Sequence, residues 1–153
     1  GGAAIDVFPE EPRANGDPFS SPLATLDNVI LTPHIGGSTE EAQYDIGRFV
    51  AAKIGEYQAS GSTDMSVNLP NLTMNVGKRS RYRIRLIHRN VPGVMARVNQ
   101  IFAASEANVD AQILATVDEV GYVLTDISAG LGREALEELT HLPETVRLIA
   151  TPL

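Results

Sequence analysis

Residues 81–94 read RYRIRLIHRNVPGV, and this stretch decides the fold of the second half of the chain. Its first eight residues alternate polar and apolar side chains, which is typical of a half-buried strand with Tyr82, Ile84 and Leu86 facing inward. Pro92 and Gly93 then end the alternation, and proline is favoured in the first turn of a helix. The stretch therefore predicts a strand that turns directly into a helix.

The residues that follow complete a recognisable order of elements. Apolar spacing predicts a helix over 93–106, a hairpin of strands 108–116 and 120–127, a helix from Gly132 to Pro143, and a last strand over 146–150. The order is βαββαβ, the ferredoxin-like α+β arrangement of a four-stranded antiparallel sheet with both helices on one face. We expect this domain to occupy residues 79–153.

A basic stripe raises the question of nucleic acid, since half of the chain's 12 Lys and Arg lie in residues 78–89. We reject nucleic-acid binding, because Arg81, Arg83 and Arg85 have a simpler explanation as the outer face of the strand. The chain also carries a net charge of −7, and no aromatic residues alternate with the arginines to stack on bases. We expect the stripe to be solvated or paired with acids of a neighbouring domain.

The first half reads as part of an α/β layer. Residues 3–8 form a short buried strand that Pro9 stops, and residues 28–33 form a second, nearly continuous apolar strand typical of a parallel sheet. Ser38 and Glu41 make a capping box, and apolar residues at helical spacing continue to about residue 58. The octet 34–41 therefore joins a strand to a long helix, and ligands of α/β sheets bind at such places.

His34 lies at the end of the second predicted strand. It is either a loop histidine satisfied by local backbone groups or a general acid/base, and the second reading requires a carboxylate partner. Glu11 and Glu10 both follow the preceding strand, and parallel strands would bring either acid to the same edge of the sheet as His34. Spacing alone does not choose between the two acids.

The composition bounds the rest of the interpretation. A small, polar stretch at 59–78 predicts a linker after a first part of residues 1–58, and residues 1–77 hold all of the net negative charge. Cysteine is absent, which excludes disulfides and Cys-based metal sites, agrees with a cytoplasmic location, and leaves no metal site to predict. No apolar run is long enough to span a membrane. Because the chain begins at Gly1 without Met, we expect it to be a fragment of a longer protein.

Residues 2–12 and 31–39 resemble the closing segment of the NAD-dependent D-2-hydroxyacid dehydrogenases, through GAAIDVF, PEEP and LTPHIGGST. The resemblance implies that Glu11 and His34 belong to a catalytic Arg/Glu/His set. It also implies that NAD is contacted by Asp6 and by the turn His34, Ile35, Gly36, Gly37. The family's substrate arginine and its G-x-G-x-x-G loop match nothing in this sequence. We therefore expect the chain by itself to be inactive.

The turn after the strand 81–88 places His88 and Asn90 beside the N-H groups of a helix N-terminus, which suits the carboxylate of a small ligand. The alternative is that Asn90 caps the helix and His88 merely ends a strand. Residues 86–94 together with 108–110 resemble an ACT domain, a small amino-acid-binding regulatory module. This resemblance implies that L-serine lies between His88 and Asn90 of one domain and Asn108 of a second, in a homo-oligomer paired edge to edge.

The two resemblances together imply one activity. It is the NAD-dependent oxidation of 3-phosphoglycerate to 3-phosphohydroxypyruvate in serine synthesis, with L-serine as feedback inhibitor. Two alternatives stay open. One is a stand-alone amino-acid-binding module, and the other is a different D-2-hydroxyacid dehydrogenase with an ACT domain.

Overall fold

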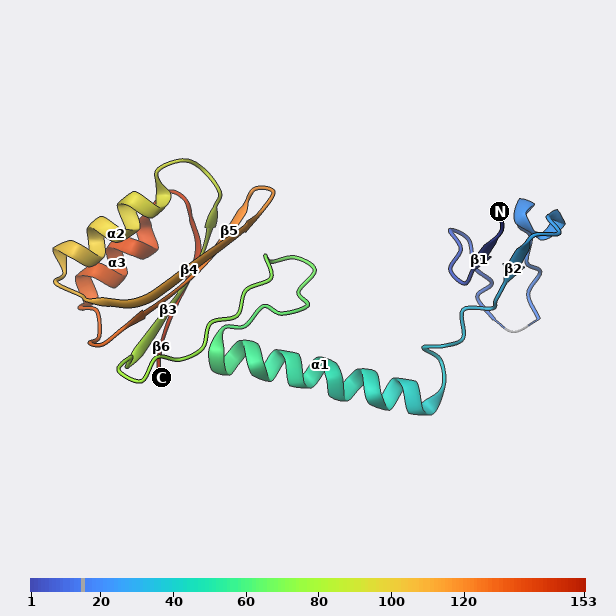
Figure 1. Ribbon diagram of the computed structural model, residues 1–153, viewed down its shortest axis with the longest axis horizontal. Coiled ribbons are helices and arrows are strands. Elements are labelled where there is room, and N and C mark those ends of the chain that lie inside the picture. Colours follow the sequence, from blue (N-terminus) through green and yellow to red (C-terminus); the bar gives the residue numbers. More distant parts are fainter. Residues whose placement is uncertain (15) are drawn as a thin grey trace. The chain divides into compact units, whose positions relative to one another are not determined.

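The computed structural model describes residues 1–14 and 16–153 and divides into two compact units, Gly1–Val50 and Ala51–Leu153 (Figure 1). The first unit holds two short parallel strands, β1 (Ala3–Ile5) and β2 (Val29–Leu31), with a 3-10 turn η1 (Pro22–Thr25) before β2. The parallel pairing confirms the α/β expectation. Both strands are shorter than predicted: beyond Ile5 and Leu31, Asp6 and Thr32 bond to each other through their side chains.

Helix α1 (Glu40–Ser60) leads from the first unit into the second. Thr39 caps it, since its Oγ1 accepts a hydrogen bond from Ala42 N at 3.1 Å. The predicted capping box on Ser38 was therefore wrong by one residue. The error arose because Ser38 and Thr39 are both good caps and spacing cannot separate neighbouring candidates.

The second unit contains a four-stranded antiparallel sheet in the order β4-β5-β3-β6, with α2 (Val94–Ala104) and α3 (Arg133–His141) on one face (Figure 1). The strands are β3 (Tyr82–Arg89), β4 (Val109–Val117), β5 (Val120–Ile127) and β6 (Thr145–Pro152). This is the predicted βαββαβ order. Apolar residues of both helices and of the central strands form the core, among them Leu86, Val98, Phe102, Val123 and Leu139.

The other face of the sheet is covered by the end of α1 and the segment 61–80. Leu72 packs on Tyr122 and Leu124 of β5, and Tyr122 donates a hydrogen bond to Gly61 O at 2.7 Å. Thr63 is buried as well: its N-H donates to Leu72 O, and its Oγ1 accepts from Leu72 N at 3.0 Å. The stretch with linker composition thus forms a third layer on the sheet.

The arginine stripe of β3 anchors this layer. Arg83 is fully buried and forms a two-pronged ion pair with Asp126, with nitrogen-oxygen distances of 2.6 and 2.8 Å. Its Nη1 donates to the carbonyls of Ser60 and Met74, while Arg85 donates to Tyr57 O at 2.7 Å. Arg81 is exposed as expected, but the expectation of solvation or of acids from a neighbouring domain was wrong for Arg83 and Arg85. These two cations bind the carbonyl end of α1, where a helix carries partial negative charge.

Tyr82 also departs from the prediction. It was expected to face inward with Ile84 and Leu86, yet it is 37% exposed and its ring lies against Gly130. Alternation along a strand predicts which side a residue faces. It does not predict where the covering helices end, and at the first residue of β3 they leave the tyrosine at the margin of the core.

We predict that Asp126→Asn lowers the free energy of unfolding of the second unit by about 3–5 kcal/mol, because it leaves the buried Arg83 charge uncompensated. Urea denaturation followed by circular dichroism measures this loss. The matched control is Arg133→Gln, which removes the exposed pair of Arg133 with Glu137 and should change stability by about 0.5 kcal/mol or less. Equal effects of the two substitutions would contradict the assignment of Arg83 as the anchor.

Candidate functional site

The first candidate site lies at the carboxyl ends of β1 and β2. Ile5 pairs with Leu31 in register, and Thr32 N donates to Ile5 O at 3.0 Å. The segments that follow the two strands therefore start side by side. One leads to Glu11 and the other to His34.

Asp6 holds the turn that carries His34. Its Oδ1 accepts hydrogen bonds from the Thr32 hydroxyl and from the backbone N-H of His34, the latter at 3.1 Å. The pKa of Asp6 is lowered, chiefly by the hydrogen bond from Thr32. His34 has a φ of 49°, a left-handed conformation that non-glycine residues rarely adopt. The carboxylate of Asp6 therefore stabilises the backbone on which the histidine stands.

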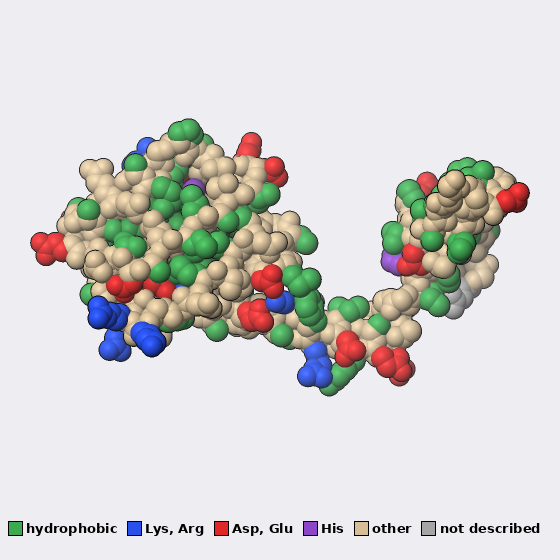
Figure 2. Space-filling model, viewed as in Figure 1, with side chains coloured by type: hydrophobic (Ala, Val, Ile, Leu, Met, Phe, Trp, Pro, Cys, Tyr) green, Lys and Arg blue, Asp and Glu red, His purple; other side chains and the backbone are tan. Residues whose placement is uncertain are grey.

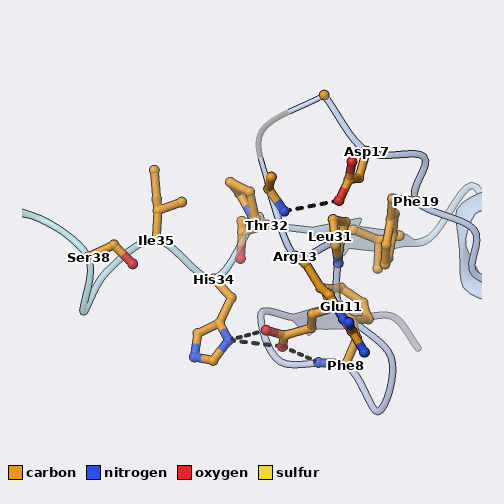
Figure 3. A pocket seen from close by; sticks show the side chains of 14 residues that line it. Phe8, Glu11, Arg13, Asp17, Phe19, Leu31, Thr32, His34, Ile35 and Ser38 are labelled. Carbon is orange, nitrogen blue, oxygen red and sulfur yellow. Dashed lines mark hydrogen bonds and ion pairs between the residues drawn. The ribbon is translucent and has the colours of Figure 1, made fainter.

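Glu11 and His34 are in direct contact. Both carboxylate oxygens of Glu11 lie 2.9 Å from His34 Nδ1, and Phe8 N donates to Glu11 Oε1 (Figure 3). The pKa of His34 is raised, first by the hydrogen bond with Glu11 and then by its charge. The pKa of Glu11 is lowered, first by the Phe8 N-H and then by His34. Of the two acids that spacing allowed, the structure brings Glu11 to the ring.

The pair borders a cavity of about 660 Å³. Phe8 and Phe19 form part of its wall, and their rings pack edge to face with centroids 4.8 Å apart. Arg13 and Thr32 supply polar groups (Figure 3). Sequence reasoning missed both polar residues. The run of prolines around Arg13 marks a loop without saying where it folds, and Thr32 read as part of an apolar strand.

The predicted cofactor turn lies partly beside this cavity. Ile35 lines it with a side chain that is 60% exposed, whereas Gly36 and Gly37 do not line it. A Cβ built on either glycine would meet nothing within 4 Å. Open space therefore lies next to the backbone of both glycines.

The predicted effector residues belong to the second unit. His88 is buried at 2% exposure near the end of β3, and Asn90 donates from its side chain to Asp118 O at 3.1 Å. Asn90 N also donates to Glu119 O, so this residue ties β3 to the hairpin between β4 and β5. It does not cap α2, whose N-cap is Gly93 without a side-chain hydrogen bond.

Asn108 lies at the opposite end of the sheet from His88. The residue after it, Val109, and Tyr82 both pair with Ile127 of β5, so the two lie at one level of the sheet. His88 and Thr116 both pair with Gly121, at a second level. Six residues of β3, from Tyr82 to His88, separate the two levels, or about 20 Å. One chain therefore does not bring Asn108 to His88 and Asn90.

Comparison with known proteins agrees with this division into two units. Residues 1–36 match the model of the D-isomer specific 2-hydroxyacid dehydrogenase NAD binding domain, and residues 84–147 match that of the AHAS small subunit-like ACT domain. D-3-phosphoglycerate dehydrogenase of Escherichia coli is 49% identical over 95% of this chain. Over 95% of its length the chain is therefore similar to a D-3-phosphoglycerate dehydrogenase.

Two further D-3-phosphoglycerate dehydrogenases are similar to the chain over the same extent. D-3-phosphoglycerate dehydrogenase of Haemophilus influenzae is 45% identical, and that of Dictyostelium discoideum is 43% identical, each over 95% of this chain. The chain spans about a third of the length of these relatives: 36% of the Escherichia coli protein and 35% of each of the other two.

Two further findings concern the described residues, 1–14 and 16–153. None of their helices combines the length and the apolar character that crossing a bilayer requires. Within the same residues, no group of three or more His, Cys, Asp or Glu side chains is arranged to hold a metal ion.

We predict that Glu11→Gln lowers the pKa of His34 toward its ordinary 6.5, because the neutral amide neither accepts as strongly nor carries charge. The pKa of His34 is higher in the folded protein than in the unfolded one. Its contribution to stability is therefore complete below the pKa of the unfolded state and is lost as pH rises through the pKa of the folded state. The contribution of Glu11 is present above its unfolded pKa and is lost as pH falls through its lowered one. The pair therefore stabilises the fold between the two folded pKa values.

Proton NMR titration of the ring Hε1 resonances measures this pKa, and the His34 signal is identified by its loss in His34→Gln. Glu10→Gln is the matched control and should leave the titration midpoint of His34 unchanged. Glu10 is next to Glu11 in the sequence, but the carboxylate bonded to the His34 ring is that of Glu11. The same midpoint in Glu11→Gln and wild type would show that the pair does not form in solution.

Proposed function

We propose that this chain is part of a protein as long as its relatives. In that protein Glu11 and His34 serve the NAD-dependent oxidation of 3-phosphoglycerate to 3-phosphohydroxypyruvate, as the relatives' name suggests. The observation that carries the proposal is the Glu11-His34 pair at the edge of a cavity. Nδ1 faces the carboxylate, so Nε2 is the nitrogen left to exchange a proton with a ligand. For Nε2, no hydrogen bond is recorded among the described residues.

In the proposed reaction His34 Nε2 removes the proton of the substrate hydroxyl. The hydrogen of the same carbon would leave as hydride, for which NAD, when bound, would supply the acceptor. The imidazolium that forms is stabilised by the Glu11 carboxylate, which raises the pKa of His34. Asp6 keeps the histidine in position through its backbone N-H.

The residues around the turn fit a nicotinamide cofactor. Gly36 and Gly37 leave open space beside the backbone at the carboxyl end of a parallel strand pair, where such cofactors bind. The exposed Ile35 offers an apolar side chain to a flat ring. Asp6 Oδ1 is already used by Thr32 and His34, so Oδ2 is the oxygen that Asp6 would offer to the nicotinamide end.

A chimera tests this proposal: residues 1–153 replace the matching third of the Escherichia coli relative, which is 49% identical. We expect the chimera to reduce NAD with 3-phosphoglycerate. His34→Ala should abolish activity, and Glu11→Gln should lower kcat by about 100-fold or more, as for loss of an acid/base function. Absorbance of NADH measures both rates.

Glu10→Gln in the chimera is the matched control and should keep kcat within about twofold, because a neighbouring acid without contact to the ring has no part in the chemistry. The 153-residue chain alone should form no NADH. Full activity of the chimera carrying His34→Ala would overturn the proposal. Activity with another 2-hydroxy acid in place of 3-phosphoglycerate would favour a different dehydrogenase of this class.

We further propose that the ACT domain binds L-serine between two copies of the chain. The supporting observation is the separation of Asn108 from His88 and Asn90 within one chain. If two copies join their β4 edges antiparallel, Asn108 of one copy reaches the level of the hairpin of the other. That arrangement brings Asn108 of the second copy close to His88 and Asn90.

The β4 edge has the character of such an interface. Its apolar side chains Val109, Ile113, Leu114 and Val117 are between 37% and 43% exposed. Figure 2 shows apolar side chains gathered on the second unit over the part where Figure 1 draws β4. An exposed apolar edge strand is a template for pairing with another chain.

We propose that L-serine bound here acts as a feedback inhibitor and that the protein is cytoplasmic. The absence of cysteine agrees with a reducing compartment. A stand-alone amino-acid-binding module is the alternative. It predicts serine binding together with a chimera that has no dehydrogenase activity.

We predict that Asn108→Ala lowers the affinity for L-serine at least tenfold in calorimetric titration, because the ligand loses hydrogen bonds from the second copy. Asn68→Ala is the matched control, since the Asn68 side chain bonds only locally, to Ser66. Binding by the Asn108→Ala variant at wild-type affinity would remove Asn108 from the site.

We predict that Leu114→Lys shifts the chain from dimer to monomer in analytical ultracentrifugation, because a lysine on an edge strand opposes strand pairing. The control is Val146→Lys on the other edge strand, β6, where the valine is 66% exposed. If the β6 substitution dissociates the dimer and the β4 substitution does not, the interface lies on β6 and the proposal is wrong.

A further inference from the structure

The ring of His88 occupies the space where residue 121 has no side chain. His88 and Gly121 are direct partners across β3 and β5. A Cβ on Gly121 would lie 2.3 Å from Cε1, 2.4 Å from Nε2 and 2.9 Å from Nδ1 of the imidazole. These separations are far below van der Waals contact, so no other residue fits at 121 while the ring keeps its place.

The need for glycine at this position comes from the ring and not from the backbone. Gly121 is absent from the glycines with positive φ, which are Gly16, Gly61 and Gly93. It lies within the regular part of β5, in register with both of its neighbours. An alanine could therefore adopt the backbone of residue 121, and the clash would fall on the imidazole alone.

The same packing selects the state of the imidazole. His88 Nδ1 lies 2.9 Å from the carbonyl oxygen of Arg89, and a carbonyl can only accept, so Nδ1 carries the hydrogen. In the neutral ring Nε2 is then a hydrogen-bond acceptor. It is buried, and none of the described residues gives it a partner. A buried acceptor of this kind is costly unless a ligand supplies the hydrogen.

Gly121 also determines the direction in which Nε2 lies. Its strand, β5, separates β3 from the edge strand β4, and Thr116 of β4 is its partner on the far side. Since Nε2 lies over the missing side chain of Gly121, the ring extends from β3 across β5 toward the edge strand. A side chain at 121 would turn it away from that edge.

We propose that Gly121 is a positioning residue of the effector site: it keeps the His88 imidazole directed toward the β4 edge with Nε2 as an acceptor for a hydroxyl or ammonium hydrogen of the ligand. The inference rests on the proposed binding of an amino acid at His88. It adds the group that His88 recognises and the residue that makes this recognition possible.

The experiment compares wild type with Gly121→Ala in the 153-residue chain. Nitrogen-15 NMR of the histidine ring reports the tautomer, and a nuclear Overhauser contact between His88 Hε1 and the Gly121 α protons reports the ring position. We expect the Nδ1-protonated form and the contact in wild type, and a changed tautomer signal in Gly121→Ala. Titration with L-serine should show at least a tenfold loss of affinity in the variant.

Two further variants separate positioning from stability. Gly132→Ala alters the N-cap of α3, where a Cβ meets nothing within 4 Å, and should leave the ring signal and the affinity in place. In a His88→Ala background, Gly121→Ala should change the affinity less than twofold, because the group it displaces is already gone. The double variant also removes the clash, so it folds even if Gly121→Ala alone does not.

Each outcome is decisive. An unchanged ring signal in Gly121→Ala, or a displaced ring with unchanged serine affinity, would overturn the inference. An equal loss of affinity on adding Gly121→Ala to His88→Ala would overturn it too, because Gly121 would then act without the ring. If wild type does not bind L-serine, the proposed effector is wrong, and the ring signals alone still decide whether Gly121 positions His88.

Discussion

The buried ion pair between Arg83 and Asp126 is the interaction on which the second unit depends. A guanidinium removed from water needs partners for all of its donors, and here it finds a carboxylate on β5 and the carbonyls of Ser60 and Met74. The pair thus joins the sheet to the end of α1 and to the segment after it. Arg85 adds a second attachment at Tyr57 O. Arg83 supplies a donor to Ser60 O, and Arg85 adds a second donor to Tyr57 O, which also accepts from Gly61 N; the last turn of α1 has no basic residue of its own.

This anchoring gives the second unit three layers, not the two of a bare ferredoxin-like fold. Leu72 and Tyr57 cover Tyr122 and Leu124, so apolar contacts and ion pair act on the same face of the sheet. Burial raises the pKa of Tyr122, whose hydroxyl is held by Gly61 O. The helix that begins six residues after His34 therefore ends in a fixed attachment to the domain that carries His88.

The two candidate sites use the same device for different chemistry. In each, an acceptor at Nδ1 orients a histidine and leaves Nε2 for a ligand. At His34 the acceptor is the carboxylate of Glu11, which favours the charged ring and so suits proton removal. At His88 it is the neutral carbonyl of Arg89, which places a hydrogen on Nδ1 and leaves Nε2 of the neutral ring as an acceptor for a donor. The charge of the group behind the ring distinguishes a proposed catalytic histidine from a proposed recognition histidine.

The sequence by itself determined the order βαββαβ, the parallel pair of strands, the long helix and the position of His34 at a strand end. All of these follow from period, turn residues and chain direction, which are local properties. Tertiary structure alone decided that Glu11 and not Glu10 meets His34, that Thr39 caps α1, and that Arg83 is buried. It also decided that Gly121 makes room for His88. These outcomes depend on which atoms, distant in sequence, meet in space, and a one-dimensional pattern of polar and apolar residues does not contain those distances.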